Sequence, residues 1–209
     1  GSHTGQTEVR VDASSMVFVG YGVSAPEQDW DDYAGLDVKG KTVVMLINDP
    51  GFHSGDESLF EGRRMTYYGR WTYKFEEAAR RGASAAILIH DTPGAAYGWD
   101  VVKSSWSGAQ FDLLVADDPA PRLPMQGWIS AETAKTLFTD AGLDIDTLRD
   151  AAGKRGFKSV PMGDAKLDAT IRNTIKQSQS RNVIAKLRGS TRPDEAIVYS
   201  AHWDHLGVH

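Results

Sequence analysis

The sequence predicts an α+β protein built in two parts, and three observations support this prediction. Short apolar runs typical of buried strands alternate with amphipathic stretches typical of helices over most of the chain. The pattern changes after Pro161, where apolar and polar residues begin to alternate as in half-exposed strands. No internal repeat is visible, and 209 residues suit one large domain or two small ones. We therefore expect a first unit over residues 16–160 and a second over residues 161–209.

The composition excludes several classes of protein. The net charge is −5 and no basic stripe offsets it, which argues against a nucleic-acid partner. No run approaches the roughly 18–20 apolar residues that a membrane span needs, so we expect no membrane span. The chain has no cysteine, which excludes disulfides and thiolate metal sites.

The first elements follow an amino-terminal segment, residues 1–15, that contributes nothing to the fold prediction. Gly1-Ser2-His3 is typical of the remnant of a cleaved expression tag. Apolar runs at residues 16–22 and 41–47 predict two buried strands, and the turn sequence Asn48-Asp49-Pro50-Gly51 closes the second. Residues 51–70 hold four glycines without a clear period, so we expect a loop there.

A helix is predicted over residues 71–81. Its apolar side chains recur at helical spacing on one face: Trp71, Phe75, Ala78 and Ala79. Gly82 is suited to the left-handed position that ends a helix, and residues 85–89 form the next apolar strand. Strand, helix and strand in close order predict a βαβ-like unit.

The second half of the chain contains further helices and strands. Residues 91–124 are rich in Gly, Ser, Pro and aromatic residues and are expected to form a long loop. Ser130 is suited to the N-cap of a helix that runs to Ala141, and a shorter helix is expected over residues 145–152. Three further strands are predicted at 167–171, 181–187 and 196–200.

The last predicted strand delivers two polar residues to its carboxyl end, His202 and Asp204. In open α/β sheets this edge collects ligand-binding and catalytic groups. Neutral imidazole is a common zinc ligand, and in an H-x-D sequence the carboxylate either orients the imidazole or binds the metal itself. A hydrogen-bonded His–Asp pair with a structural role only is the alternative.

The surrounding residues carry a family resemblance. The pattern consists of N-V-I-A-x-L-x-G-S at residues 182–190, an acidic loop at 193–195, an apolar strand and A-H-x-D at 201–204. It resembles the opening of the catalytic domain in peptidase family twenty-eight, the zinc aminopeptidases related to aminopeptidases S and Y and to glutamate carboxypeptidase. The resemblance implies that His202 ligates one zinc ion and that Asp204 orients this histidine from behind. The metallo-β-lactamase motif H-x-H-x-D-H is also similar, but Ser200 replaces its first histidine.

Three upstream segments, residues 17–22, 33–44 and 74–89, resemble a protease-associated (PA) domain. This β-rich module with flanking helices precedes the catalytic residues in many of these peptidases. The resemblance implies a PA domain over residues 16–160. The first strands of an α/β zinc-peptidase domain would then follow over residues 161–209.

The resemblance implies a function for the parent protein. It would be a hydrolase, a two-zinc metallo-aminopeptidase that removes amino-terminal residues from peptides, in an extracytoplasmic (periplasmic or secreted) bacterial location. The family's remaining metal ligands lie downstream of A-H-x-D, so we expect this truncated chain to be inactive and to bind no zinc stably. His205 and His209 lie close to His202 in sequence and would be the partners in any adventitious site. A non-catalytic PA-type module that binds proteins or peptides is the alternative.

Other residues suggest further roles. Arg70 and Trp71 lie in an aromatic stretch, either on a substrate-facing surface or as packing residues. His53 is expected in a solvated turn, and the pair His90-Asp91 is expected to close a strand with a structural role. Exposed strand edges over residues 166–201 predict either a homo-oligomer or a small sheet that folds back beside the first unit.

Overall fold

The computed structural model describes residues 1–112 and 120–202. Its contacts divide the chain into two units, Gly1–Ile175 and Lys176–His209. The first unit is compact and holds the helices and strands given below. None of the described helices is long and apolar enough to cross a membrane.

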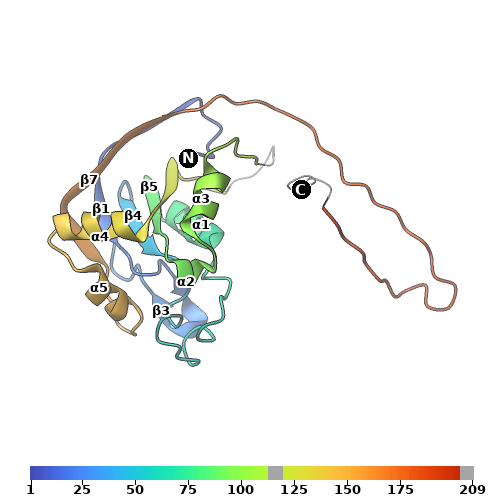
Figure 1. Cartoon of the computed structure of the whole chain (residues 1–209), viewed down its shortest axis with the longest axis horizontal. Helices are drawn as coiled ribbons and strands as arrows, with labels where there is room; N and C mark the ends of the chain where they lie inside the picture. The colour runs from blue at the N-terminus through green and yellow to red at the C-terminus, as the bar shows by residue number, and fades with distance from the viewer. Residues whose placement is uncertain (113–119, 203–209) are drawn as a thin grey trace. The chain divides into compact units, whose positions relative to one another are not determined.

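A five-stranded sheet forms the centre of the first unit, with the strand order β6-β5-β4-β1-β7 (Figure 1). Four strands are parallel to their neighbours, and the fifth runs antiparallel beside β1. The five strands are β1 (Glu8–Phe18), β4 (Thr42–Leu46), β5 (Ala85–Ile89), β6 (Met125–Ile129) and β7 (Val160–Arg172). A small antiparallel pair lies apart from this sheet, β2 (Ser24–Ala25) with β3 (Trp30–Asp31).

The helices follow the strands in alternation. They are α1 (Trp71–Arg80), α2 (Thr92–Ala95), α3 (Trp99–Trp106), α4 (Ala131–Asp140) and α5 (Ile145–Ala152), with a 3-10 turn over Pro26–Gln28. Strand β4, helix α1 and strand β5 form the predicted βαβ unit, because β4 and β5 are parallel. The predicted mixture of helices and strands is confirmed, but the mostly parallel sheet makes the fold a mixed α/β architecture rather than α+β.

The predicted start of the helix after Ser130 is confirmed, whereas the strand predicted at residues 16–22 is wrong at both ends, because pairing with β7 extends β1 back to Glu8 and β1 ends at Phe18. The Ser130 hydroxyl accepts a hydrogen bond from the Thr133 amide and caps α4, as its sequence position predicts. The prediction of a loop over residues 91–124 is wrong in part, because α2 and α3 lie within it. Asp91 explains the first of them, since its carboxylate accepts from the Gly94 amide and caps α2.

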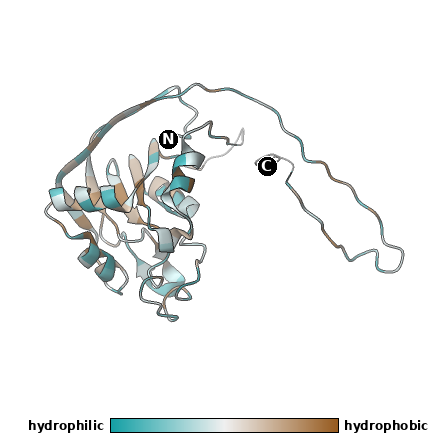
Figure 2. Cartoon of the chain, in the orientation of Figure 1, coloured by the Kyte–Doolittle hydropathy of each residue, from teal (hydrophilic) through white to brown (hydrophobic). Residues whose placement is uncertain are grey.

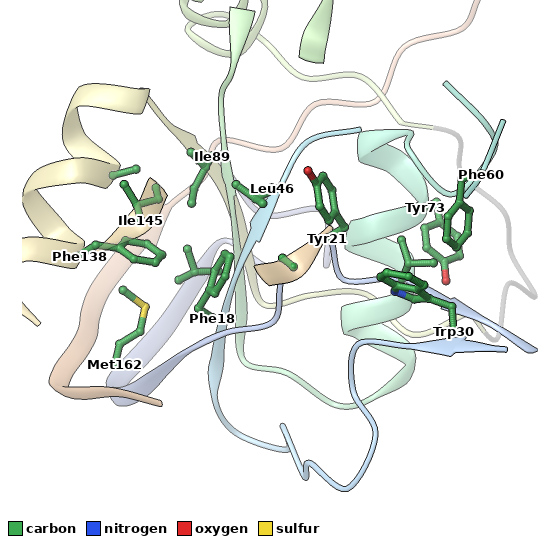
Figure 3. Packing of buried hydrophobic residues seen from close by; sticks show 14 of the residues in the cluster. Phe18, Tyr21, Trp30, Leu46, Phe60, Tyr73, Ile89, Phe138, Ile145 and Met162 are labelled. Carbon is green, nitrogen blue, oxygen red and sulfur yellow. The ribbon is translucent and has the colours of Figure 1, made fainter. Parts of the chain in front are cut away.

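Helices cover both faces of the sheet, and each face has its own core. On one face, Phe18 packs edge-to-face against Phe138 of α4 and against Phe157, with ring centroids 5.2 Å and 5.9 Å apart. Figure 3 shows Phe18 against Phe138, with Ile145 and Met162 beside them. On the other face α1 contributes Phe75. The central strands are coloured hydrophobic in Figure 2, as expected for strands buried on both sides.

Strand β7 belongs to the sheet of the first unit. It pairs with β1 from Glu8↔Arg172 to Phe18↔Val160, with register shifts in between. The boundary between the two compact units therefore falls after Ile175, whereas the change in sequence pattern is at Pro161. The alternation of residues 167–171 is that of an edge strand with one exposed face.

The second unit has no helix or strand within residues 176–202. The predicted strands at 181–187 and 196–200 are therefore not formed there. A strand is stable only when neighbouring strands satisfy its backbone groups and cover its side chains. Instead, the apolar side chains of these runs are exposed, as Leu187 shows at 99%.

Candidate functional site

Polar residues gather at the carboxyl edge of the parallel strands. Gly20-Tyr21-Gly22 follows β1, Asn48-Asp49 follows β4 and His90-Asp91 follows β5. Because these strands are parallel, their carboxyl ends meet at one edge, where α/β proteins commonly bind ligands. We define the carboxyl-edge cluster as four residues that follow these strands, Tyr21, Asn48, Asp49 and Asp91, together with Lys74 of α1, whose Nζ donates to the Tyr21 carbonyl.

Asp49 is fixed in this cluster by three hydrogen bonds. Its carboxylate accepts from the Thr66 amide at 2.6 Å and from the Thr66 hydroxyl at 3.0 Å, and its own amide donates to the Asn48 side chain. Asn48 donates in turn to the Gly94 carbonyl at 2.6 Å. Burial raises the pKa of Asp49. These bonds tie the loop after β4 to the loop before α1 and to helix α2.

Lys74 is the one fully buried lysine among the described residues. It projects from α1, and its Nζ donates to the Tyr21 carbonyl. Burial lowers the pKa of Lys74 to about 8, while the nearby carboxylates of Asp49 and Asp32 act in the opposite direction. A buried lysine between two carboxylates is typical of a structural ion cluster as well as of a reactive amine.

Asp32 is the second buried carboxylate near Lys74. It accepts from the Val23 amide at 2.9 Å and from the Trp30 indole N–H at 2.8 Å. Burial raises the pKa of Asp32 to about 7, even though both hydrogen bonds favour its charged form. Asp32 thus links the residue just before β2 to Trp30 of β3 in the small β2–β3 pair.

The structure brings together two residues that lie far apart in the sequence. His53 Nε2 lies 3.0 Å from Asp91 Oδ2, and both side chains are partly exposed. The hydrogen bond from His53 is the main reason that the pKa of Asp91 is lowered. The sequence predicts only a solvated turn at His53 and a structural role for Asp91. The spacing of 38 positions between the two residues holds no local signal of this pairing.

His90, next to Asp91, has the structural role that its sequence position predicts. Its ring is 2% exposed, and its Nε2 lies 3.0 Å from the Tyr97 carbonyl. The ring also contacts Trp99 and Trp128. His90 therefore packs between the end of β5 and the segment that leads into α3.

Two buried polar atoms near this edge have no hydrogen-bond partner within the described part of the chain, the Tyr21 hydroxyl and Arg149 Nε. Figure 3 shows Tyr21 at the end of the core beside Leu46. Burial is the main reason that the pKa of Tyr21 is raised, and the charge of Arg149 opposes this. A polar site of this kind is suited to one bound water that bridges two groups.

Trp71 and Arg70 lie at the start of α1. Trp71 is 39% exposed, and its ring packs edge-to-face against Phe75 and Trp106, with centroids 6.2 Å and 5.9 Å apart. Trp106 in turn contacts Trp128 of β6. We call Trp71, Phe75, Trp106 and Trp128 the aromatic wall. Arg70 is exposed at the N-cap of α1.

An open pocket of about 580 Å³ lies beside Trp30. Its lining includes the acidic residues Asp29 and Asp31 and the basic residues Arg155 and Lys158. Arg155 donates to the carbonyls of Gln28 and Asp29, and Asp31 is paired with Arg81. Two of the four charged side chains, Arg155 and Asp31, are thus engaged within the protein, and the pocket carries no assignment of a ligand.

The predicted zinc ligand lies in the second unit. His202 is exposed, and Asp204 lies outside the described residues, as do His205 and His209. No group of three His, Asp or Glu side chains within residues 1–112 and 120–202 could hold a metal ion. The carboxyl-edge cluster, as far as the structure describes it, therefore contains no such group.

The comparisons with known proteins add one structural neighbour. No family model matches the chain, and no curated protein matches it. Among solved structures, an aminopeptidase from Aneurinibacillus sp. strain AM-1 is similar, with a TM-score of 0.31 and 16% sequence identity. The match covers 81% of this chain and 28% of that chain. A likeness of this size is too weak to assign a fold or an activity.

Proposed function

We propose that this chain is part of a two-zinc metallo-aminopeptidase of peptidase family twenty-eight. The compact unit would be its PA domain, and the segment from Lys176 onward would be the opening of its catalytic domain. The observation that carries the proposal is the ordered pattern N-V-I-A-x-L-x-G-S, acidic loop, apolar strand and A-H-x-D over residues 182–204. The family implies an extracytoplasmic enzyme that removes amino-terminal residues from peptides.

The exposure of the second unit supports this proposal. Val183, Ile184 and Leu187 are 87%, 90% and 99% exposed, and a second exposed run contains Ile197, Val198 and Tyr199. Continuous apolar runs of this kind are typical of strands that are buried on both faces of a parallel sheet. The pattern therefore fits strands whose covering layers lie outside the described residues.

His202 and Asp204 would act together in that domain. The imidazole of His202 is a zinc-type ligand, and Asp204 would accept the other ring N–H and so fix the tautomer. A zinc ion, when bound, supplies an activated water for peptide hydrolysis. Catalytic zinc needs three protein ligands, and the described residues supply only His202 to such a site. The remaining ligands would therefore have to come from the rest of the catalytic domain.

Two measurements test the proposal. The coding sequence beyond codon 209 is expected to contain an Asp-Asp-Gly run and a later Glu-Glu pair, and a stop codon there would favour the non-catalytic binding module. The protein encoded by the complete gene should hydrolyse leucine-p-nitroanilide with added zinc, and His202→Ala should abolish this activity. The chain of residues 1–209 should show no hydrolysis above a metal-free blank. Hydrolysis by this chain would contradict the proposal that its site is incomplete.

A further inference from the structure

Strand β6 is an edge of the sheet with backbone groups directed outward. The Ile129 carbonyl accepts from the His90 amide at 2.8 Å, so Ile129 faces β5. Because successive residues of a strand alternate in the direction of their backbone groups, Gln126 and Trp128 direct their N–H and C=O away from β5. These two residues form the part of the edge that another chain segment could pair with.

The amino terminus of the chain occupies one of these two positions. The Gly1 ammonium donates to the Gln126 carbonyl at 2.6 Å, and the Gln126 amide donates to the Gly1 carbonyl at 2.9 Å. Two reciprocal bonds between one pair of residues are the pattern of an antiparallel bridge. Gly1 therefore pairs with Gln126 in the manner of a single antiparallel bridge, and residues 1–7 form no strand. The next bonded position in that direction falls at Pro124, which has no amide hydrogen, so the pairing stops there.

An aromatic surface lies beside the docked residue. A Cβ atom on Gly1 would lie 4.0 Å from the indole ring of Trp106, at ordinary van der Waals distance. Trp106 is held in place by Trp71, Phe75 and Trp128 of the aromatic wall. A larger apolar side chain at this first position would therefore have a ring to pack on, without a clash at its Cβ.

We propose that the edge of β6, together with Trp106, is a docking site for the amino-terminal residue of an extended peptide. The two backbone bonds to Gln126 recognise the extended main chain, and the ammonium group makes one of them charge-assisted. Trp106 favours an apolar first side chain. The identification of such a peptide as a substrate rests on the proposed function, whereas the binding itself requires neither zinc nor His202.

Nuclear magnetic resonance of a variant that begins at Thr4 tests this proposal, because deletion of Gly1–His3 empties the edge. Titration with the amidated peptide Leu-Ser-His should shift the amides of residues 126–128 and the indole N–H of Trp106. The matched peptide Gly-Ser-His should bind about fivefold more weakly, because it lacks the apolar side chain. Acetylation of the leucine peptide should weaken binding about tenfold, since the charge-assisted bond is lost.

Three variants at two positions separate docking from general damage to the fold. Trp106→Ala should remove the difference between the leucine and glycine peptides, and Trp106→Phe should retain it. Gln126→Pro removes one outward-facing donor and should weaken both peptides about tenfold, with an unchanged thermal unfolding midpoint. The intact chain, whose own amino terminus occupies the edge, should bind the leucine peptide more weakly than the deletion variant.

Three results would overturn the proposal. They are unchanged amide shifts at residues 126–128 when the leucine peptide is added to the deletion variant, equal affinities for the leucine and glycine peptides, and equal affinity for the acetylated peptide. None of these results depends on hydrolysis of leucine-p-nitroanilide. Peptide binding at β6 by a protein without peptidase activity would contradict the proposed function and leave this proposal intact. Peptidase activity of the complete protein without amide shifts at β6 would contradict the docking proposal and leave the proposed function intact.

Discussion

Two runs of similar apolar character differ in structure: one forms a buried strand and the other is exposed and forms none. Thr42–Leu46 forms β4, and all five of its residues are buried between β1 and β5. Residues 181–187 contain a comparable apolar run, yet Val183, Ile184 and Leu187 are exposed and the run forms no strand. The difference shows that a buried strand depends on its neighbours as much as on its own residues. Parallel strands in particular need helices on both faces.

The same contrast applies to charged residues. Within the described part of the chain, the buried Asp, Glu, Lys and His side chains all belong to the compact unit: Asp32, Asp49, Lys74, Glu77 and His90. Each is held by hydrogen bonds or by a nearby opposite charge, as the Asp32 bonds to Val23 and Trp30 illustrate. Burial of such groups requires a well-packed surrounding. The compact unit thus has the properties of an independently folded domain, and the second unit does not.

The largest expected effect is a difference between matched substitutions in the two units. Phe138→Ala should reduce the free energy of unfolding by about 3–5 kcal/mol, because it leaves a cavity against Phe18 in the core. Leu187→Ala should change it by less than about 0.5 kcal/mol, since that side chain is exposed. Urea unfolding followed by tryptophan fluorescence measures both values.

An equal loss of stability in the two variants would contradict the difference in burial between Phe138 and Leu187. It would mean that Leu187 is covered in solution, for example by a second copy of the chain. Size-exclusion chromatography with light scattering then identifies the covering partner. A monomer with a stabilising Leu187 would instead indicate that the second unit folds onto its own chain.

The sequence was sufficient to predict the elements with strong local signals. The α1 and α4 helices and the strands β4 and β5 follow from helical periodicity, the Ser130 cap and short apolar runs. The strand order was not predictable, since pairing of β1 with β7 joins residues more than a hundred positions apart. The failed strands at 181–187 and 196–200 have the correct local pattern and lack the neighbours that such strands require.

The candidate site was less predictable than the fold. The pairing of His53 with Asp91 depends on the meeting of two loops at the carboxyl edge of the sheet. The burial of Lys74 could not be predicted from the sequence, because lysines in an amphipathic helix are normally solvent-exposed. Gly1 has the sequence context of a tag remnant, yet it marks the outward-facing edge of β6. Each of these contacts is set by tertiary geometry and has no counterpart in residue spacing.

A smaller effect is expected from pH. Burial raises the pKa of Asp32 in the folded protein to about 7, whereas an unfolded aspartate titrates near about 3.9. Between these values the folded state retains a proton that the unfolded state has lost, so stability falls as the pH rises through about 7. Relative to Asp32→Asn, the unmodified chain should lose on the order of 2 kcal/mol between about pH 4.5 and pH 7.5.

Urea unfolding of both proteins at about pH 4.5, 6.0 and 7.5 tests this sign. The absolute free energy of unfolding of Asp32→Asn is not informative, because the introduced amide places an N–H group against one of the donors from Val23 and Trp30. The comparison therefore uses only the change in the free energy of unfolding with pH. Parallel curves would show that Asp32 is not the source of the pH dependence. The range stops below about pH 8, where the lowered pKa of Lys74 adds a contribution of the opposite sign.

The smallest expected effect comes from removing the second unit altogether. A chain that ends at Ile175 keeps the whole five-stranded sheet, including β7, and both of its cores. Its free energy of unfolding should therefore match that of residues 1–209 within about 0.5 kcal/mol, while its tendency to associate should fall because the exposed run around Leu187 is gone. A chain that ends at residue 159 is the matched control, and it should unfold because β1 loses its antiparallel partner. If cutting at Ile175 were as damaging as cutting before β7, the two regions would form one cooperative unit, and the contrast between β4 and residues 181–187 would lose its basis.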